Sequence, residues 1–275
     1  MRKTLILALL LSLVAWVAPM AANAEAPVLL MATTTSTDNT GLLDYLAPLY
    51  QKETGVEVRW TAVGTGKALA MGADCNVDVL LVHAPAAEKA HMEKGYSVDR
   101  REIMYNDFVI IGPAADPAGV KGSSVENALK AINAKHAVFT SRGDNSGTHK
   151  AELGLWKAAG LAVPDGQAWY VQTGQGMIAT INVAAEKSGY TMTDRGTYIK
   201  YEDTFKGNPP LKILVEGDKR LFNQYSVLAV NPKHCPNAQY DRATQFSEWM
   251  AKPSTQKLIG DFKLLGKQLF YGNAQ

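Results

Sequence analysis

The segment from His136 to Leu153, HAVFTSRGDNSGTHKAEL, sets Arg142, Asp144 and several hydroxyl and glycine residues between an apolar run and a helix-like one. Three kinds of chemistry use such residues. They are a serine nucleophile in GDNSG, an adhesive RGD triplet, and a cradle of hydrogen-bond donors for an anion. The rest of the sequence decides between them.

The nucleophile and the adhesive triplet find little support. The serine of GDNSG is displaced by one position from the serine-protease turn, and the sequence holds no G-x-S-x-G. A base could come from several histidines, but their spacing selects none of them: His83, His91, His136 and His149. RGD is a three-letter match that needs an exposed loop to support it.

Polar clusters recur at one kind of place along the chain. They are TTTSTDNTG, GTGK, SRGDNSGTH and TGQG, and each follows an expected strand and precedes an expected helix. Ligands bind at the carboxyl ends of strands in open α/β sheets, and helix N-termini offer free N–H groups and partial positive charge. Serine and threonine are also ordinary helix caps, so one cluster alone means little. Together the clusters predict an anion site.

Two segments partly match nucleotide-binding motifs, but neither match is supported. TAVGTGKA has Thr61 where a P-loop has its first glycine, and Ala68 where a hydroxyl would bind magnesium. TGQGMIA, followed by Asp194, fits a permissive dinucleotide fingerprint. It lies midway along an exported chain, however, and a helix N-terminus with backbone donors explains it better.

The first 24 residues predict export. Arg2 and Lys3 precede an apolar stretch from Leu5 to Val17, and small residues then lead to a cleavage site before Glu25, as in a secretory signal peptide. Cleavage lowers the basic count from 28 to 26, which equals the 26 acidic residues. A neutral chain without a basic run excludes nucleic acid as a partner. We expect a soluble periplasmic protein.

The two cysteines, Cys75 and Cys235, leave two interpretations open. A disulfide is permitted in an oxidising compartment, and two separate buried thiols are the alternative. The cysteines do not predict a metal site, because no C-x-x-C spacing or paired histidines accompany them.

Strands alternate with helices along the mature chain, which predicts crossover units and a mostly parallel sheet. Two such series are separated by MYNDFVIIGPAADPAGVKG, a strand that runs into a loop of prolines and glycines. We expect the chain to cross there between two lobes. The predicted division is a discontinuous first lobe of residues 25–111 and 222–275, and a second lobe of residues 112–221.

A resemblance then adds to this reading. ATTTSTDNTGLLDYL, AVGTGKALAMG, DVLLVHAP, MYNDFVIIGP, SRGDNSGTHKAELGLW, WYVQTGQGM, YTMTDRGTY and LVEGDKRLFNQYSVLAVNP resemble, in order, the tungstate-binding proteins of ABC importers. The resemblance covers nearly all of the mature chain. It implies an α/β periplasmic-binding fold with two lobes, each a mostly parallel sheet flanked by helices.

The resemblance also implies a function. Tungstate or molybdate would be held in the cleft between the lobes and delivered to an ABC permease in the inner membrane, by a monomer without enzymatic activity, cofactor or bound metal ion. The sequence does not separate tungstate from molybdate. The rival hypothesis is an exported oxidoreductase or hydrolase that uses the same cleft.

The candidate oxyanion-binding residues lie in the polar clusters. They are Thr35, Ser36 and Thr65 in the first lobe, and Arg142, Ser146, Gly147, Thr148 and Gly176 in the second. SRGDNSGT is also similar to the arginine-bearing loop of phosphate-binding proteins, but Val79–Pro85 lacks the acid that those proteins place there. This departure argues against phosphate. Asp144 has two open roles: it holds Arg142 or caps the next helix, or it accepts a proton from a protonated ligand.

Overall fold

The computed structural model describes residues 26–275. The predicted signal peptide, residues 1–24, lies outside them. Within the described part, no helix is both long enough and apolar enough to cross a bilayer.

The first part of the chain alternates strands with helices: β1 (Val28–Thr34), α1 (Thr35–Asp38), α2 (Leu42–Thr54), β2 (Glu57–Val63), α3 (Thr65–Ala73), β3 (Val79–Val82) and α4 (Pro85–Glu93). β1 pairs in parallel with both β2 and β3. Parallel neighbours are what helical crossovers between strands require. The polar cluster after β1 and the cluster after β2 therefore lie at the same edge of the sheet.

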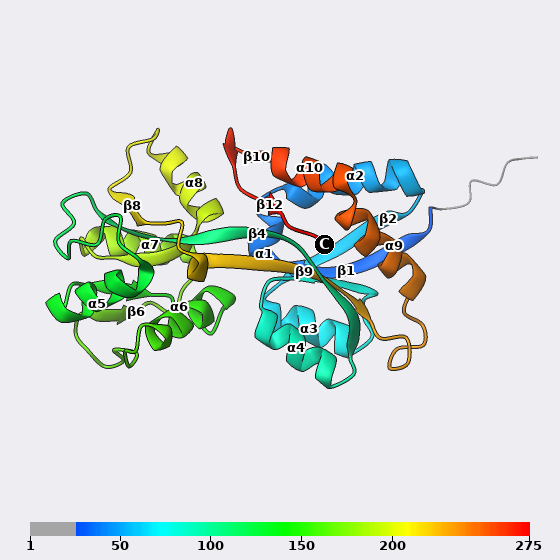
Figure 1. Cartoon of the computed structure of the whole chain (residues 1–275), viewed down its shortest axis with the longest axis horizontal. Coiled ribbons are helices and arrows are strands. Elements are labelled where there is room, and N and C mark those ends of the chain that lie inside the picture. Colours follow the sequence, from blue (N-terminus) through cyan, green and yellow to red (C-terminus); the bar gives the residue numbers. More distant parts are fainter. Residues whose placement is uncertain (1–25) are drawn as a thin grey trace, which may run out of the picture.

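Two long strands, β4 (Ser97–Pro113) and β9 (Phe222–Val230), then run antiparallel to each other. Figure 1 shows them passing from the helices α1–α4, α9 and α10 on one side to α5–α8 on the other. We call the part with α1–α4, α9 and α10 the first lobe, and the part with α5–α8 the second lobe.

The second lobe is built from α5 (Val125–Lys135), β5 (Phe139–Ser141), α6 (Gly147–Ala158), β6 (Tyr170–Gln172), α7 (Met177–Glu186), β7 (Thr191–Asp194), α8 (Arg195–Thr204), β8 (Leu211–Val215) and a 3-10 turn, Lys219–Leu221. β5 and β6 are parallel, whereas β7 and β8 pair antiparallel with β4.

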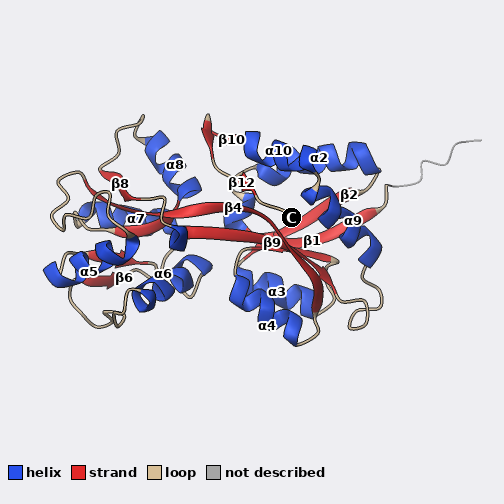
Figure 2. Cartoon of the chain, in the orientation of Figure 1, coloured by secondary structure: helices blue, strands red, loops and turns tan. Residues whose placement is uncertain are grey.

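After β9 the chain stays in the first lobe and forms α9 (Tyr240–Ala251), α10 (Pro253–Asp261), β10 (Lys263–Leu264), β11 (Lys267–Gln268) and β12 (Tyr271–Gly272). β10 and β11 form a short hairpin, and β12 pairs antiparallel with β4. Figure 2 shows helices on both sides of the strands in this lobe.

The α/β architecture is therefore the predicted one, with mixed sheets. The expected parallel pairs are present, and antiparallel pairs are added by β4 and β9. The reason is connectivity: one strand carries the chain out to the second lobe and the other brings it back, so the two run in opposite directions.

Buried apolar side chains form separate clusters in the two lobes. Those around Tyr50 and Leu80 belong to the first lobe, and those around Trp156 and Ile181 to the second. Each fully buried large side chain stabilises its cluster by about 1.5–3 kcal/mol. Ile199 of α8 is an exception, because it packs into a first-lobe cluster.

Along β4, Met104 packs into a first-lobe cluster and Phe108 into a second-lobe cluster. Near β9, Leu221 packs into the second-lobe cluster and Tyr225 into the first-lobe cluster. The boundary that the sequence suggests at residues 111 and 112 lies slightly farther along β4.

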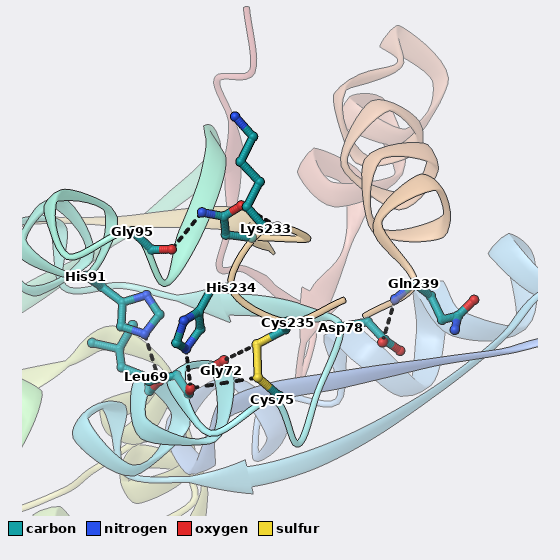
Figure 3. The surroundings of a disulfide bond; sticks show 12 residues. Leu69, Gly72, Cys75, Asp78, His91, Gly95, Lys233, His234, Cys235 and Gln239 are labelled. Carbon is teal, nitrogen blue, oxygen red and sulfur yellow. Dashed lines mark hydrogen bonds between the residues drawn. A yellow bond between two sulfur atoms is a disulfide. The ribbon is translucent and has the colours of Figure 1, made fainter. Parts of the chain in front are cut away.

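A disulfide joins Cys75, just after α3, to Cys235 in the loop after β9 (Figure 3). The disulfide hypothesis is therefore confirmed over separate thiols. His234 lies beside it, with its Nε2 atom 2.8 Å from the carbonyl oxygen of Ala73. Both sulfur atoms are bonded to each other, so they do not serve as thiolate ligands. Nearby, Asp78 accepts hydrogen bonds from the backbone N–H groups of Leu30 and Gln239, which ties the same loop to β1.

We expect replacement of both cysteines, C75S with C235S, to lower the free energy of unfolding by about 2–5 kcal/mol, because the crosslink restricts the unfolded chain. Urea unfolding of the oxidised wild type and of the variant measures this. Adding reductant should shift the wild type towards the variant and leave the variant unchanged. Equal unfolding free energies in oxidised wild type and variant would contradict a stabilising role.

Candidate functional site

The arginine-bearing loop, residues 142–146, connects β5 to α6. Gly143 and Asn145 both have left-handed backbone angles, with φ of 61° and 58°. A Cβ atom at Gly143 would lie 2.8 Å from the Cβ atom of Gln172, so glycine is required there. Ser146 is the N-cap of α6, and its Oγ atom accepts a hydrogen bond from the N–H of His149. The loop is therefore sharply turned and delivers the first turn of α6 at a fixed position.

Within this loop Arg142 and Asp144 bind each other. The Nε and Nη2 atoms of Arg142 lie 3.1 Å and 2.5 Å from Oδ2 of Asp144, and each side chain is 20% exposed. Oδ1 of Asp144 accepts from the N–H of Ser146 at 3.1 Å. Partial burial raises the pKa of Asp144, but hydrogen bonds from Ser146 and Arg142 outweigh it and hold the pKa below its ordinary value. Asp144 is thus an ionised holder of Arg142 and of the loop.

A buried carboxyl group holds α6 against the neighbouring strands. Glu152 accepts hydrogen bonds from the Ser141 hydroxyl at 2.6 Å, the Tyr170 hydroxyl at 2.7 Å and the Trp156 indole N–H at 3.1 Å. These contacts connect α6 to β5 and β6. Burial raises the pKa of Glu152, and the hydrogen bonds oppose that shift.

In the first lobe, hydroxyl groups gather at the end of β1. Thr34 is the N-cap of α1, and its Oγ1 atom lies 2.7 Å from Oγ1 of Thr37 and 3.1 Å from Oγ of Ser36. Nε2 of His83 lies 3.0 Å from Oγ1 of Thr34 and 3.2 Å from Oγ of Ser36. His83 follows β3, so the ends of two neighbouring parallel strands meet here, as expected for this sheet edge.

His83 continues into a hydrogen-bonded network on the long strands. Its Nδ1 atom lies 2.9 Å from Oδ1 of Asn223, and the Asn223 amide donates to Oδ1 of Asn106 at 2.8 Å. The ring of His83 stacks on Tyr225, with 4.7 Å between ring centroids. Asn106 and Asn223 are paired residues of β4 and β9. The network therefore links the first-lobe hydroxyl groups to the strands that cross between the lobes.

The two lobes approach each other at the start of α6. A Cβ atom built on Gly147 would lie 3.7 Å from Cε1 of His83 and 3.7 Å from Oγ1 of Thr65. Thr65 is the first residue of α3, and Gly147 is the first residue of α6. Two helix N-termini thus converge on the hydroxyl cluster from opposite lobes. Their free N–H groups and positive ends favour an anion at this junction.

The structure brings some of the predicted residues together directly and places the others at the starts of helices. Thr65 and Gly147 meet across the junction, Ser36 reaches the same histidine, and Arg142 stands in the loop that starts α6. The remaining candidates are first-turn or cap residues of α1, α6 and α7: Thr35, Ser146, Thr148 and Gly176. Gly176 lies in the loop after β6. In this loop the N–H of Gly174 donates a hydrogen bond to the carbonyl oxygen of Arg142, which joins it to the arginine loop.

Sequence reasoning missed Thr34, Asn223 and the site position of His83. Thr34 belonged to a quoted cluster, and His83 stood at the end of a predicted strand, so position alone could have found both. Asn223 lies 140 residues from His83 in the chain. No local pattern could have indicated that contact.

The rival motifs have structural roles. In the RGD triplet, both carboxylate oxygens of Asp144 are engaged, by Arg142 and by the N–H of Ser146, so this carboxylate is not free for an adhesive partner. Nδ1 of His149 accepts from the N–H of Asn145, while Ser146 caps the helix. Asp194 caps α8 by accepting from the N–H and the hydroxyl of Thr197. These atoms are committed to the backbone or to each other.

A second group of cationic side chains lines a cavity of about 330 Å³ that includes Arg195, Lys212 and Lys267. Arg195 donates to both carboxylate oxygens of Asp107 at 2.6 Å, and Lys267 pairs with Glu202. Two of the cations of this cavity are thus paired with acids, as Arg142 is at the junction.

Comparison with known proteins places the chain in a family. Residues 21–254 match the model of the PBP superfamily domain. The tungstate-binding protein TupA of Campylobacter jejuni subsp. jejuni serotype O:2 is 54% identical over 240 residues, covering 87% of this chain and 89% of that protein. The chain belongs to the PBP superfamily and, within it, to the TupA family.

Solved structures agree with this TupA-family assignment. The tungstate-binding protein TupA from Desulfovibrio alaskensis G20 is 70% identical, with a TM-score of 0.88 over 91% of this chain and 100% of that one. The tungstate ABC transporter structure from Geobacter sulfurreducens is 45% identical, with a TM-score of 0.75 over 86% and 98% of the two chains. These relatives are named for tungstate binding and for an ABC transporter, and the enzyme alternative finds no support among them.

Proposed function

We propose that this protein captures tungstate between its two lobes and delivers it to the permease of an ABC importer, without catalysing a reaction. The observation that carries the proposal is the approach of Gly147 to Thr65 and His83 across the junction. It gathers two helix N-termini, a hydroxyl cluster and an arginine-bearing loop at one place. The names of the TupA relatives support tungstate as the anion.

The chemistry of the junction suits a tetrahedral dianion. Such an ion loses its hydration on entering a partly buried site and must regain hydrogen bonds and some charge balance. Arg142 offers a planar and permanently charged group, although its pairing with Asp144 leaves the loop without net charge. Hydroxyl groups and backbone N–H groups supply the remaining donors.

We propose residues 25–111 with 222–275, and residues 112–221, as the approximate lobes, with the hinge in β4 and β9 near Asn106 and Asn223. The two asparagines are hydrogen-bonded to each other at the crossing. Lys200 of α8 donates to the carbonyl oxygen of Asn39. Together with the pair of Lys267 and Glu202, this contact holds the lobes together in the present arrangement.

The setting of the protein is also part of the proposal. A cleaved signal peptide of residues 1–24 would place a monomer in the periplasm, where it would meet a permease in the inner membrane. Molybdate has the same charge and nearly the same size as tungstate, so it is the second ligand that the site would accept. No cofactor is required for this role.

We expect titration of the mature protein to rank tungstate and molybdate first, sulfate well behind and phosphate last. Phosphate carries a hydroxyl group near neutral pH, and the nearest acceptors are engaged, Asp144 by Arg142 and Ser146, and His83 by hydroxyl groups. An unpaired buried donor costs roughly 1–3 kcal/mol. Sulfate avoids this cost, but it is smaller, so its hydrogen bonds would stretch beyond about 2.7–3.2 Å.

Isothermal titration calorimetry at neutral pH measures this order, with one protein preparation for all four anions. Phosphate that competes on equal terms with tungstate would contradict the proposed ligand. Turnover of a substrate with no oxyanion binding would favour the enzyme alternative instead.

We expect Arg142→Ala to weaken tungstate binding by about 2–5 kcal/mol, because the partly buried anion loses the guanidinium group that pairs with its charge. Arg142→Lys should also bind less tightly, because lysine lacks the planar fork. Calorimetric dissociation constants measure both effects.

Arg59→Ala is the matched control for Arg142→Ala. Arg59 also pairs with an acid two residues away, Glu57, but lies on the exposed surface of β2. The control should bind tungstate as the wild type does. Wild-type affinity in Arg142→Ala would remove Arg142 from the site.

A further inference from the structure

His83 is the ionisable side chain that stands between the first-lobe hydroxyl cluster and the opposite lobe. It is partly buried, contacts Thr34 and Ser36 through Nε2, and lies opposite Gly147. Its hydrogen-bond partners determine which ring nitrogen carries the proton, and this in turn determines what the ring can offer to an anion.

The network on the long strands fixes the tautomer. The Asn223 amide nitrogen donates to Oδ1 of Asn106 at 2.8 Å and to the hydroxyl of Tyr225 at 3.3 Å. The carbonyl oxygen of Asn223 therefore faces Nδ1 of His83, and a carbonyl oxygen only accepts. Nδ1 must carry a hydrogen, so in the neutral ring Nε2 is a bare acceptor.

This acceptor competes with an anion for hydroxyl hydrogens. Thr34 and Ser36 each have one hydroxyl hydrogen, and one of the two must point at Nε2 to satisfy it. That hydrogen is then unavailable to an oxyanion. A neutral His83 also presents its lone pair near the junction, which disfavours negative charge there. The site as it stands is therefore not fully arranged for a dianion.

Fixed charges around His83 do not supply the positive charge that a dianion would need there. Across the junction Arg142 and Asp144 cancel each other. From the side of β7, Asp194 acts on the ring with a negative charge. Tyr225 of β9 stays protonated, because burial raises its pKa well above the ordinary range. None of these groups adds net positive charge beside the hydroxyl cluster.

The charged groups on the adjoining helices are occupied or point elsewhere. Asp38 of α1 accepts from the indole N–H of Trp60. Lys67, on the first turn of α3, is exposed to solvent. Glu88 of α4 accepts from the N–H of Ala84 and pairs with Arg100. His149 of α6 is buried, and its Nδ1 atom accepts from the N–H of Asn145. His83 is the ionisable side chain that is itself hydrogen-bonded to the hydroxyl cluster.

We propose that binding of the dianion is coupled to uptake of one proton from solvent by Nε2 of His83. The inference rests on the proposed oxyanion function. Nε2 becomes an N–H donor, the ring becomes an imidazolium, and the hydroxyl hydrogen of Thr34 or Ser36 turns to the anion. One proton therefore adds a positive charge, changes Nε2 from an acceptor into a donor, and frees one hydroxyl hydrogen for the anion.

The ionisation of the free protein agrees with this coupling. Burial lowers the pKa of His83 below its ordinary value, against the opposing effects of Asn223 and Asp194. The ring is neutral near pH 7 before binding, and a dianion at hydrogen-bond distance raises its pKa. Protons are taken up in the window between the two pKa values. Affinity should therefore fall as pH rises through that window.

Calorimetry of tungstate binding in two buffers of different ionisation enthalpy, such as Tris and HEPES, counts the protons. In the wild type we expect roughly half to one proton taken up per tungstate. As pH rises from the lowered pKa of the free ring towards the raised pKa of the bound ring, the affinity should fall by up to about tenfold per pH unit. His83→Gln should bind more weakly at the lower pH, take up almost no proton and show a flat pH profile.

His91→Gln is the matched control. His91 is also a histidine of the first lobe whose pKa is lowered by burial, but it bonds to Ser97 and to the Leu69 carbonyl instead. It should keep the wild-type proton count. The wild-type measurement stands without either variant if a substitution prevents folding.

Tungstate binding without proton uptake, and with a flat pH profile in the wild type, would overturn the inference and leave the proposed function intact. Undiminished proton uptake in His83→Gln would assign the proton to another group, with Asp144 first. No tungstate binding at any pH would overturn the proposed function, and this inference with it.

Discussion

A dianion taken out of water needs donors on every side, and in the proposed function both lobes supply them. This requirement gives the strands β4 and β9 their importance. They hold Asn106 beside Asn223 at the crossing, and so set how the start of α6 meets Thr65 and His83. The two lobes have largely separate cores, and the crossing strands set their relative position together with the contacts of Lys200 with Asn39 and of Lys267 with Glu202. In the proposed function, binding brings two preorganised half-sites together.

Each half-site is preorganised by groups that do not need to touch the anion. Asp144 holds Arg142 and Ser146, Glu152 fixes α6 against β5 and β6, and Asn223 orients His83. Such fixed dipoles lower the cost of ordering donors when a ligand arrives. In the same arrangement, the net charge of the arginine loop does not determine which anion is preferred. The arginine is balanced by its own acid, so discrimination between anions depends on which hydrogens the hydroxyl groups and the histidine can present.

The sequence predicted those features that local patterns determine. Polar clusters at strand ends identified the loops after β1, β2 and β5, and apolar alternation identified the α/β class. The full length of β4 escaped prediction, because Ser97–Glu102 are mostly polar and pair with β9 only through tertiary contact. The antiparallel partners of the sheet escaped for the same reason. The contact of His83 with Asn223 joins residues far apart in the chain, and the orientation of Asp144 depends on the left-handed turns at Gly143 and Asn145. Patterns in sequence carry neither kind of information.

In the proposed function, one oxyanion lies at the junction of the two lobes. A crystal structure of the mature protein with tungstate, with diffraction recorded at a tungsten absorption edge, tests it most directly, because anomalous scattering locates tungsten independently of the protein model. We expect a single strong tungsten peak between Gly147 and the side chains of Thr65 and Ser36, with Arg142 facing it. A peak in the cavity lined by Arg195, Lys212 and Lys267, with the junction free of tungsten, would show that the oxyanion binds elsewhere.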